Sequence, residues 1–185
     1  MRRTIQNRVD HMPASDTPNW VGPLEGIRVL DLTRVLAGPA ASLALADLGA
    51  EVIKIEPPAT GDETRTFPPF RDGESHYYLS INRGKKSIVV DLKSDAGVAL
   101  VRDLAAKCDV LVENYRPGVM DRLGLGYEAL AAINPRLIYC SISGFGMTGP
   151  LRDRPSFDIV LQALSGALSV NGEPGGTPTK LGIPL

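Results

Sequence analysis

Residues able to do chemistry gather directly after five short apolar runs of the sequence. These positions carry glycines, hydroxyl groups, an amide and basic side chains, in residues 33–39, 91–93, 114–116 and 143–146, with Glu56 ending a further run. Backbone N–H groups, the amide of Asn114 and the cations of Lys93 and Arg116 suit a phosphate-bearing ligand that needs no metal. If the runs are neighbouring parallel strands, these groups meet at one edge of a sheet, where open α/β folds bind ligands.

Each of these residues also has a purely structural interpretation. Asp91 and Lys93 could cap the following helix and face solvent. Asn114 could satisfy a turn, and Gly38 with Pro39 could shape the entrance of a helix. The spacing alone leaves both interpretations open.

Motifs of other chemistries do not fit. A serine hydrolase needs G-x-S-x-G, and Ser143 in "SISGFG" has no glycine two residues earlier. His11 and His76 have no acidic partner at a metal-binding spacing. A strand–helix–strand outline ending in Glu56 suits a nicotinamide-dependent oxidoreductase, but residues 33–39 lack the G-x-G-x-x-G that lets a backbone approach a pyrophosphate. This class remains a minor alternative.

The pattern of strands and helices predicts the scaffold for these residues. Short β-branched runs at 27–32, 51–56, 87–92, 109–114 and 137–143 predict strands, and residues 38–50, 94–108 and 159–172 predict helices, with Ser94 as an N-cap and Gly49 as a stop. Alternation of this kind indicates an α/β fold, a doubly wound parallel (Rossmann-like) sheet with right-handed crossovers. Residues 56–86 are rich in proline, glycine and charge, and predict a long connection with a functional or packing role.

Composition limits the class of protein. The 185 residues are 43% hydrophobic with a formal net charge of −1, which suits one globular domain and gives no basic footprint for nucleic acid. Neither a run of about 18 apolar residues for a membrane span nor a disulfide framework is present, and the two cysteines suit a reducing, cytoplasmic setting. Residues 1–22 predict a flexible arm and residues 23–185 one domain. The arginines of the arm leave a mitochondrial location as an alternative, which Asp10 and Asp16 weaken.

A series of motifs in a fixed order carries a family resemblance. The stretches are "PLEGIRVLDLTRVLAGPAASLALADLGAEVIKIEPPATGDETR", "NRGKKSIVVDLKS", "DVLVENYRPGVMDRLGLGYEAL", "NPRLIYCSISGFGMTGP" and "RPSFDIVLQALSGALSVNG". Together they resemble the amino-terminal part of the class III CoA-transferases, the CaiB/BaiF type, over residues 23–185. The stretch "SHYYLSINRGKKSI" is most similar to the branch that uses succinyl-CoA and dicarboxylic acids.

The resemblance implies a coenzyme A site, built on an incomplete large domain. The residues that match the CoA contacts of the family are Leu36, Ala37, Val90, Asp91, Leu92, Lys93, Asn114, Tyr115, Arg116 and Arg122. Two positions depart from it: Leu36 replaces the glutamine of formyl-CoA transferase, and Pro57 replaces a basic residue that helps to bind CoA. The substrates implied are an acyl-CoA and a carboxylic acid, with no tightly bound cofactor and no metal.

The resemblance also implies covalent catalysis by an aspartate. Its carboxylate attacks the thioester to give a mixed anhydride, and the released thiolate then forms an aspartyl-CoA thioester. By family spacing this nucleophile lies about two positions beyond Leu185, so no catalytic residue is expected in this chain, and Asp158 is expected to support the site. Phe157 stands where the related racemases have a histidine base, which makes racemase activity a minor alternative.

The family forms interlocked homodimers of chains more than twice this length. The sequence therefore predicts an amino-terminal fragment of a CoA-transferase, inactive alone. The main alternative is a non-catalytic CoA-binding remnant or a half-subunit.

Overall fold

A parallel sheet of five strands organises the protein. The computed structural model describes residues 22–182, so the predicted arm, apart from Gly22, and residues 183–185 lie outside the described residues. The strands are β1 (Arg28–Asp31), β2 (Glu51–Glu56), β5 (Lys86–Val89), β6 (Val110–Glu113) and β7 (Ile138–Ser141), in the order β5-β2-β1-β6-β7. All four pairings are parallel. The predicted doubly wound α/β sheet is confirmed.

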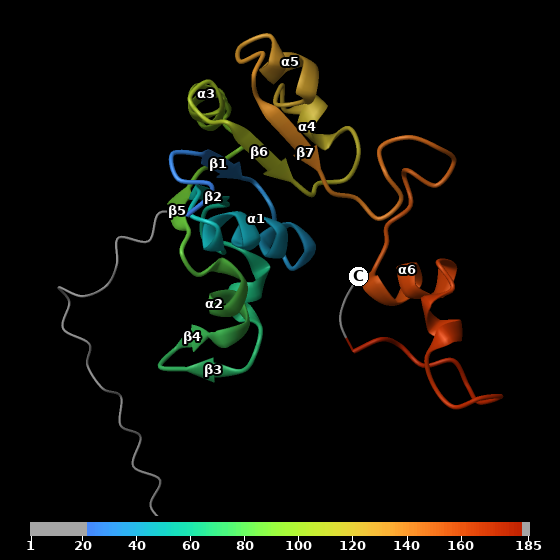
Figure 1. The fold of residues 1–185 in the computed structure, drawn as a ribbon. Coiled ribbons are helices and arrows are strands. Elements are labelled where there is room, and N and C mark those ends of the chain that lie inside the picture. The colour runs from blue at the N-terminus through green and yellow to red at the C-terminus, as the bar shows by residue number, and fades with distance from the viewer. Residues whose placement is uncertain (1–21, 183–185) are drawn as a thin grey trace, which may run out of the picture.

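Helices cover both faces of this sheet (Figure 1). On one face lie α3 (Asp95–Ala105), α4 (Val119–Arg122) and α5 (Tyr127–Ala131), and on the other lies α1 (Ala37–Asp47). The larger core cluster joins Leu30 and Leu111 of the sheet to Val101 of α3. The smaller cluster joins Val29 of β1 to Leu45 of α1. Because both faces are buried, the central strands read as continuous apolar runs.

Two predicted helices appear with small shifts at their ends. Helix α1 begins one residue before Gly38 and ends before Gly49. Helix α3 follows Ser94, whose side chain accepts a hydrogen bond from the N–H of Gly97, as an N-cap does.

The long connection after β2 is more ordered than the sequence indicates. It contains a 3₁₀ turn, η1 (Glu63–Thr66), a short hairpin of β3 (Phe70–Arg71) and β4 (Glu74–Ser75), and helix α2 (His76–Asn82). Ser75 caps α2 by accepting from the N–H of Tyr78. The sequence did not predict α2, because a seven-residue helix between glycine and proline segments has too few turns to show a helical period. Its packing role is real, since Tyr78 is buried.

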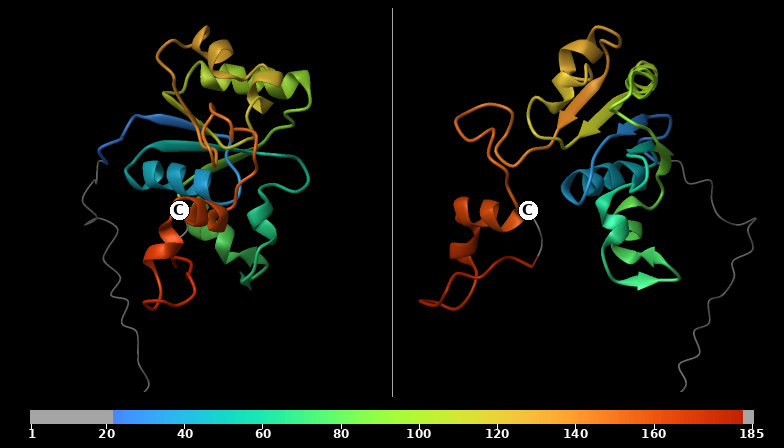
Figure 2. Two further views of the ribbon diagram at one scale, coloured as in Figure 1. Left: turned by 90° about the vertical axis from the view of Figure 1, so that its right-hand side faces the viewer. Right: turned by 180° about the vertical axis from the view of Figure 1, so that it is seen from behind.

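The carboxyl-terminal segment also differs from prediction. In place of one helix over 159–172, the structure has α6 (Asp158–Leu164) and a 3₁₀ turn, η2 (Ala167–Val170). Gly166, between them, has φ of 83°, a left-handed conformation that ends a right-handed helix. This segment lies to one side of the sheet (Figures 1 and 2) and exposes several apolar side chains, among them Phe157, Leu164 and Val170. No helix within residues 22–182 is long and apolar enough to span a membrane.

Candidate functional site

The strand order creates a switch point between β1 and β6. Numbered among themselves, the five strands run 3-2-1-4-5, so the connections from β1 and β6 leave the sheet in opposite directions. The side chain of Asn114, after β6, bridges this point. Its Oδ1 accepts from the N–H of Arg34 and its Nδ2 donates to the carbonyl of Arg34, each at 2.8 Å. Asn114 therefore fixes the loop after β1 and uses one of its two Nδ2 N–H groups to do so.

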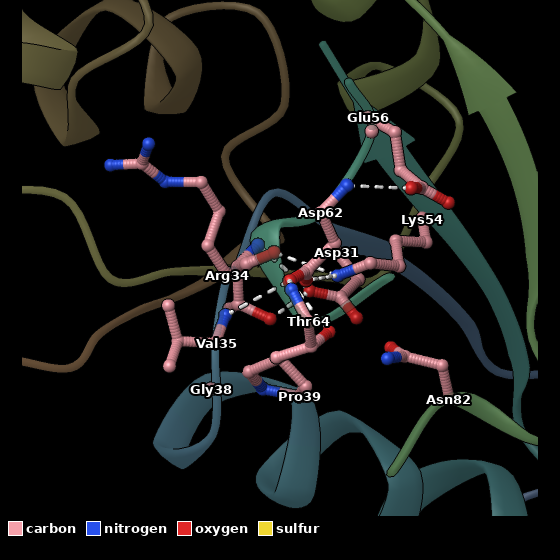
Figure 3. Close-up of polar contacts among 12 residues, drawn as sticks. Asp31, Arg34, Val35, Gly38, Pro39, Lys54, Glu56, Asp62, Thr64 and Asn82 are labelled. Carbon is pink, nitrogen blue, oxygen red and sulfur yellow. Dashed lines mark hydrogen bonds and ion pairs between the residues drawn. The ribbon is translucent and has the colours of Figure 1, made fainter. Parts of the chain in front are cut away.

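The Lys54–Asp62 pair holds the loop between β1 and α1 in place (Figure 3). Lys54 Nζ donates to the carbonyl of Thr33 at 2.8 Å and forms an ion pair with Asp62 Oδ2 at 2.9 Å. Asp62 Oδ1 lies 3.4 Å from the N–H of Val35. Both charged side chains are inaccessible to solvent, at 0% and 1% exposure, so their pairing is a structural requirement.

A second ionic group ties the long connection to the end of β2. Arg65 donates to both carboxylate oxygens of Glu56 at 2.7 Å, and Tyr78 and Ser87 donate to the same group. Burial alone favours the neutral acid, but these hydrogen bonds and the one from the N–H of Asp62 outweigh it and lower the pKa of Glu56. Glu56 is thus fully engaged within the protein, which removes the ribose-binding residue that the oxidoreductase alternative needs.

A buried lysine links α1 and α2 below the loop. Lys85 Nζ lies 3.1 Å from Asp31 Oδ2 and 2.9 Å from each of Ser42 Oγ, Asn82 Oδ1 and the carbonyl of Pro39. Burial lowers the pKa of Lys85, although Asp31 acts in the opposite direction. Gly38 and Pro39 lie in the first turn of α1, as predicted.

An open pocket of about 370 Å³ lies where α3 begins, beside the end of α4. Its lining consists of Leu92, Lys93, Ser94, Asp95, Val98, Ala99, Arg102, Arg122 and Leu123. Three of these side chains are cationic and one is anionic, so the pocket favours an anion. Its volume lies at the low end of the range of roughly 300–1,000 Å³ that is usual for small-molecule sites.

Close packing at Gly97 shapes this pocket. A Cβ at Gly97 would lie 2.0 Å from the carbonyl oxygen of Asp91, so glycine is what lets the first turn of α3 approach the end of β5. The Asp91 carboxylate accepts from the N–H of Lys93 at 2.9 Å, which fits its structural interpretation as a turn residue.

Seven of the ten predicted CoA residues fall into two groups. Leu92, Lys93 and Arg122 line the pocket, whereas Leu36, Ala37, Asn114 and Tyr115 stand at the switch point. Val90 is buried, and Asp91 and Arg116 are exposed. Burial raises the pKa of Tyr115, whose ring packs under the guanidinium of Arg34.

Two cations were missed by the sequence reasoning. Arg102 lines the pocket from α3 and donates to the carbonyl of Gly124 at 2.9 Å. Its signal was present, because Ser94, Val98 and Arg102 recur at helical spacing on one face. Arg34 gave no such signal, since its position depends on Asn114, 80 residues further along the chain.

Asp158 lies apart from the pocket. It is the first residue of α6, and its carboxylate accepts from Gln162 Nε2 at 2.8 Å. An acidic residue in the first turn stabilises a helix, so this position has a structural explanation. Within residues 22–182, no three acidic, histidine or cysteine side chains are grouped as metal ligands are.

Comparison with known proteins gives a consistent family. The chain is 53% identical over 174 residues to human succinyl-CoA:glutarate CoA-transferase, covering 94% of this chain and 40% of that protein. It is 54% identical over 161 residues to acetyl-CoA:oxalate CoA-transferase of Acetobacter aceti, covering 87% and 41%. A solved CaiB/BaiF family protein from Brucella suis superposes with a TM-score of 0.83 at 47% identity, covering 88% of this chain and 44% of that one.

The matches cover only part of each relative. The chain spans about 40% of the length of the curated relatives it matches. The model of CoA-transferase family III matches residues 24–185, which is nearly the whole chain. The protein described here therefore belongs to CoA-transferase family III.

Proposed function

We propose that this chain forms the coenzyme A-binding part of a CoA-transferase. The reaction moves CoA between an acyl-CoA, such as succinyl-CoA, and a carboxylic acid. The relatives named above act on succinyl-CoA with glutarate and on acetyl-CoA with oxalate, so a dicarboxylic acid is the acceptor or the acyl group in each name. We extend this substrate class to the present chain.

One observation carries the proposal: Lys93 and Arg122 line the same anion-favouring pocket, although they come from different elements. The phosphates of CoA bear the negative charge that such a pocket lacks, and Arg102 adds a third cation. Leu92 and Val98 supply apolar surface for the adenine base.

The thioester end of CoA then extends toward the switch point. The first N–H groups of α1 have no partner within the helix, and Leu36 provides no side-chain cap. Leu36 and Ala37 thus present backbone donors and apolar side chains to the pantetheine arm. The Lys54–Asp62 pair and Asn114 hold this loop in place without occupying it.

The chemistry we propose is attack on the thioester by an aspartate of the segment that follows Leu185 in the longer relatives. The described residues bind and orient the thioester and exclude water from the reactive anhydride. Asp158 supports this site in the assembled enzyme. We place the enzyme in the cytoplasm and as a homodimer in its full-length form, with a non-catalytic CoA-binding role as the alternative for this chain.

Calorimetric titration of the purified chain with CoA tests the binding site. We expect Lys93→Ala and Arg122→Ala each to weaken CoA binding about tenfold, the loss typical of one charge-assisted hydrogen bond. Arg136→Ala is the matched control, because Arg136 is an exposed cation near the start of β7, at the other end of the strands. Equal CoA affinity in all four proteins, or tight NADH binding without CoA binding, contradicts the proposal.

A second assay tests catalysis. The chain is incubated with succinyl-CoA and glutarate, and CoA exchange is followed by mass spectrometry. We expect no exchange and no covalent adduct, because the nucleophile is assigned to the following segment. A CoA thioester on Asp158 would show that the supporting role proposed for this residue is wrong.

A further inference from the structure

Arg34 stands at the switch point with its backbone fixed. Both hydrogen bonds from the Asn114 side chain go to its peptide groups, which leaves the guanidinium to project from the loop, away from the buried ionic cluster (Figure 3). The next residues along the chain are Val35, Leu36 and Ala37, where we place the thioester arm. Arg34 therefore lies beside the reacting end of the substrate by its position in the fold.

The guanidinium is held in orientation. Its Cζ lies over the Tyr115 ring, 4.9 Å from the ring centre, which gives a cation–π contact. This contact restrains the side chain without using its N–H groups as hydrogen-bond donors to another side chain. Tyr115 in turn follows Asn114, so the same short segment after β6 holds both the backbone and the side chain of Arg34.

Within residues 22–182, the side chain of Arg34 donates no hydrogen bond. Glu63 Oε1 lies 3.8 Å from Arg34 Nη1, beyond hydrogen-bond distance, and the two side chains are 42% and 62% exposed. An exposed pair at that distance contributes little. Arg65 gives the contrast in the same region, since it grips Glu56 with two bonds of 2.7 Å. Of these two arginines, Arg34 is the one whose guanidinium N–H groups can donate to a ligand.

We propose that Arg34 binds the free carboxylate of a dicarboxylic acyl group and so selects such groups over monocarboxylic ones. This inference rests on the proposed function. A succinyl or glutaryl chain carries one negative charge at the end remote from the thioester, and that charge needs a partner once water is excluded. A guanidinium offers two parallel N–H donors to a carboxylate.

The phosphates of CoA have their own cations. Lys93, Arg102 and Arg122 line the pocket at α3, and Arg34 is not among its lining residues. Different cations therefore bind different parts of the substrate: the pocket cations bind the nucleotide, and Arg34 binds the acyl end. Glu63 acts as a weak competitor that the substrate carboxylate displaces.

Titration with three ligands tests this division. CoA, succinyl-CoA and butyryl-CoA share the nucleotide, and the last two have acyl chains of equal carbon number, of which only succinyl ends in a carboxylate. We expect the chain to bind succinyl-CoA about tenfold more tightly than butyryl-CoA, as a charge-assisted pair provides. Arg34→Gln should abolish this ratio and leave CoA affinity unchanged. Arg34→Lys should restore part of it, and Glu63→Gln should increase it.

Distinct results overturn distinct claims. If Arg34→Gln binds CoA as the parent does but keeps the succinyl preference, the inference is wrong and the proposed function stands. If Arg34→Gln weakens all three ligands equally, Arg34 contacts the nucleotide and the inference is also wrong. If the parent chain binds no CoA at all, both claims fail. Thermal melting of each variant checks that the fold is retained, and Glu63→Gln gives an independent test should Arg34→Gln prove unstable.

Discussion

Replacing Lys54 by methionine tests the buried pair that supports the loop after β1. The change keeps much of the side-chain length and removes the charge, so Asp62 is left as a buried carboxylate without its cation. The carbonyl of Thr33 also loses its donor. We expect the free energy of unfolding to fall by about 3–5 kcal/mol, the usual cost of orphaning one member of a buried pair.

The magnitude follows from the geometry. At 2.9 Å and an effective dielectric constant of about 20, Coulomb's law gives roughly 6 kcal/mol of attraction between Lys54 and Asp62. Burial of each ion costs several kcal/mol, so the intact pair is nearly neutral, and the loss appears only when one partner remains. The hydrogen bonds from the N–H and the hydroxyl of Thr64 to Asp62 Oδ1 remain after the substitution, so they limit the loss of stability.

Urea denaturation of the parent, Lys54→Met, Asp62→Asn and the double variant measures this cost. The double variant should be at least as stable as either single variant, because it leaves no buried charge without its partner. Lys86→Met is the control: Lys86 pairs with Glu51 on the surface, with 72% and 41% exposure, and its loss should be at most about 1 kcal/mol. Equal losses for Lys54→Met and Lys86→Met, or additive single losses, would refute the reasoning.

Gly97→Ala should weaken CoA binding and lower the stability of the fold together, because the new methyl group would lie 2.0 Å from the carbonyl oxygen of Asp91. Calorimetry measures the binding, and thermal melting measures the stability. Ser94→Ala should cost about 1 kcal/mol in urea denaturation, since it removes the cap of α3. Burial raises the pKa of Glu113, despite hydrogen bonds that include one from the N–H of Tyr115, so its ionised form destabilises the fold above that pKa. Glu113→Gln should therefore increase stability at pH 7, and the gain should shrink as the pH falls through the raised pKa toward the ordinary value; a gain independent of pH would contradict this assignment.

The sheet was predictable because its determinants are local. Runs such as "RVLD" and "VLVE" are short, apolar and β-branched, and the helical faces between them recur at regular spacing. Parallel connection through helices then leaves few strand orders. Residues 57–85 were not predictable in this way, since α2 is short and is stabilised by contacts of Tyr78 with Glu56 and Arg65 that its own sequence does not announce.

The pocket was half predictable for the same reason. Lys93 was identified from its place after a predicted strand, whereas Arg122 was identified only from the family resemblance. Their meeting in one pocket depends on how α3 packs against α4, which the sequence does not state. Asn114 shows a different case: its type and place were identified from the sequence, but its two hydrogen bonds to Arg34 were not.

The loop after β1 shows why a glycine fingerprint is not needed here. Glycine-rich turns owe their close approach to backbone freedom, whereas this loop is fixed by side chains that bond its peptide groups: Lys54 holds the carbonyl of Thr33, and Asn114 holds both groups of Arg34. Val35 has φ of 67°, a conformation that costs a β-branched residue about 1–2 kcal/mol and persists only where the surroundings over-determine it. The hydrogen bonds from Lys54 to Thr33 and between Asn114 and Arg34 hold the residues before Val35 and so keep Val35 in this conformation. A loop fixed in this way holds the backbone of Arg34 in place beside Leu36 and Ala37, where we propose that the thioester arm binds.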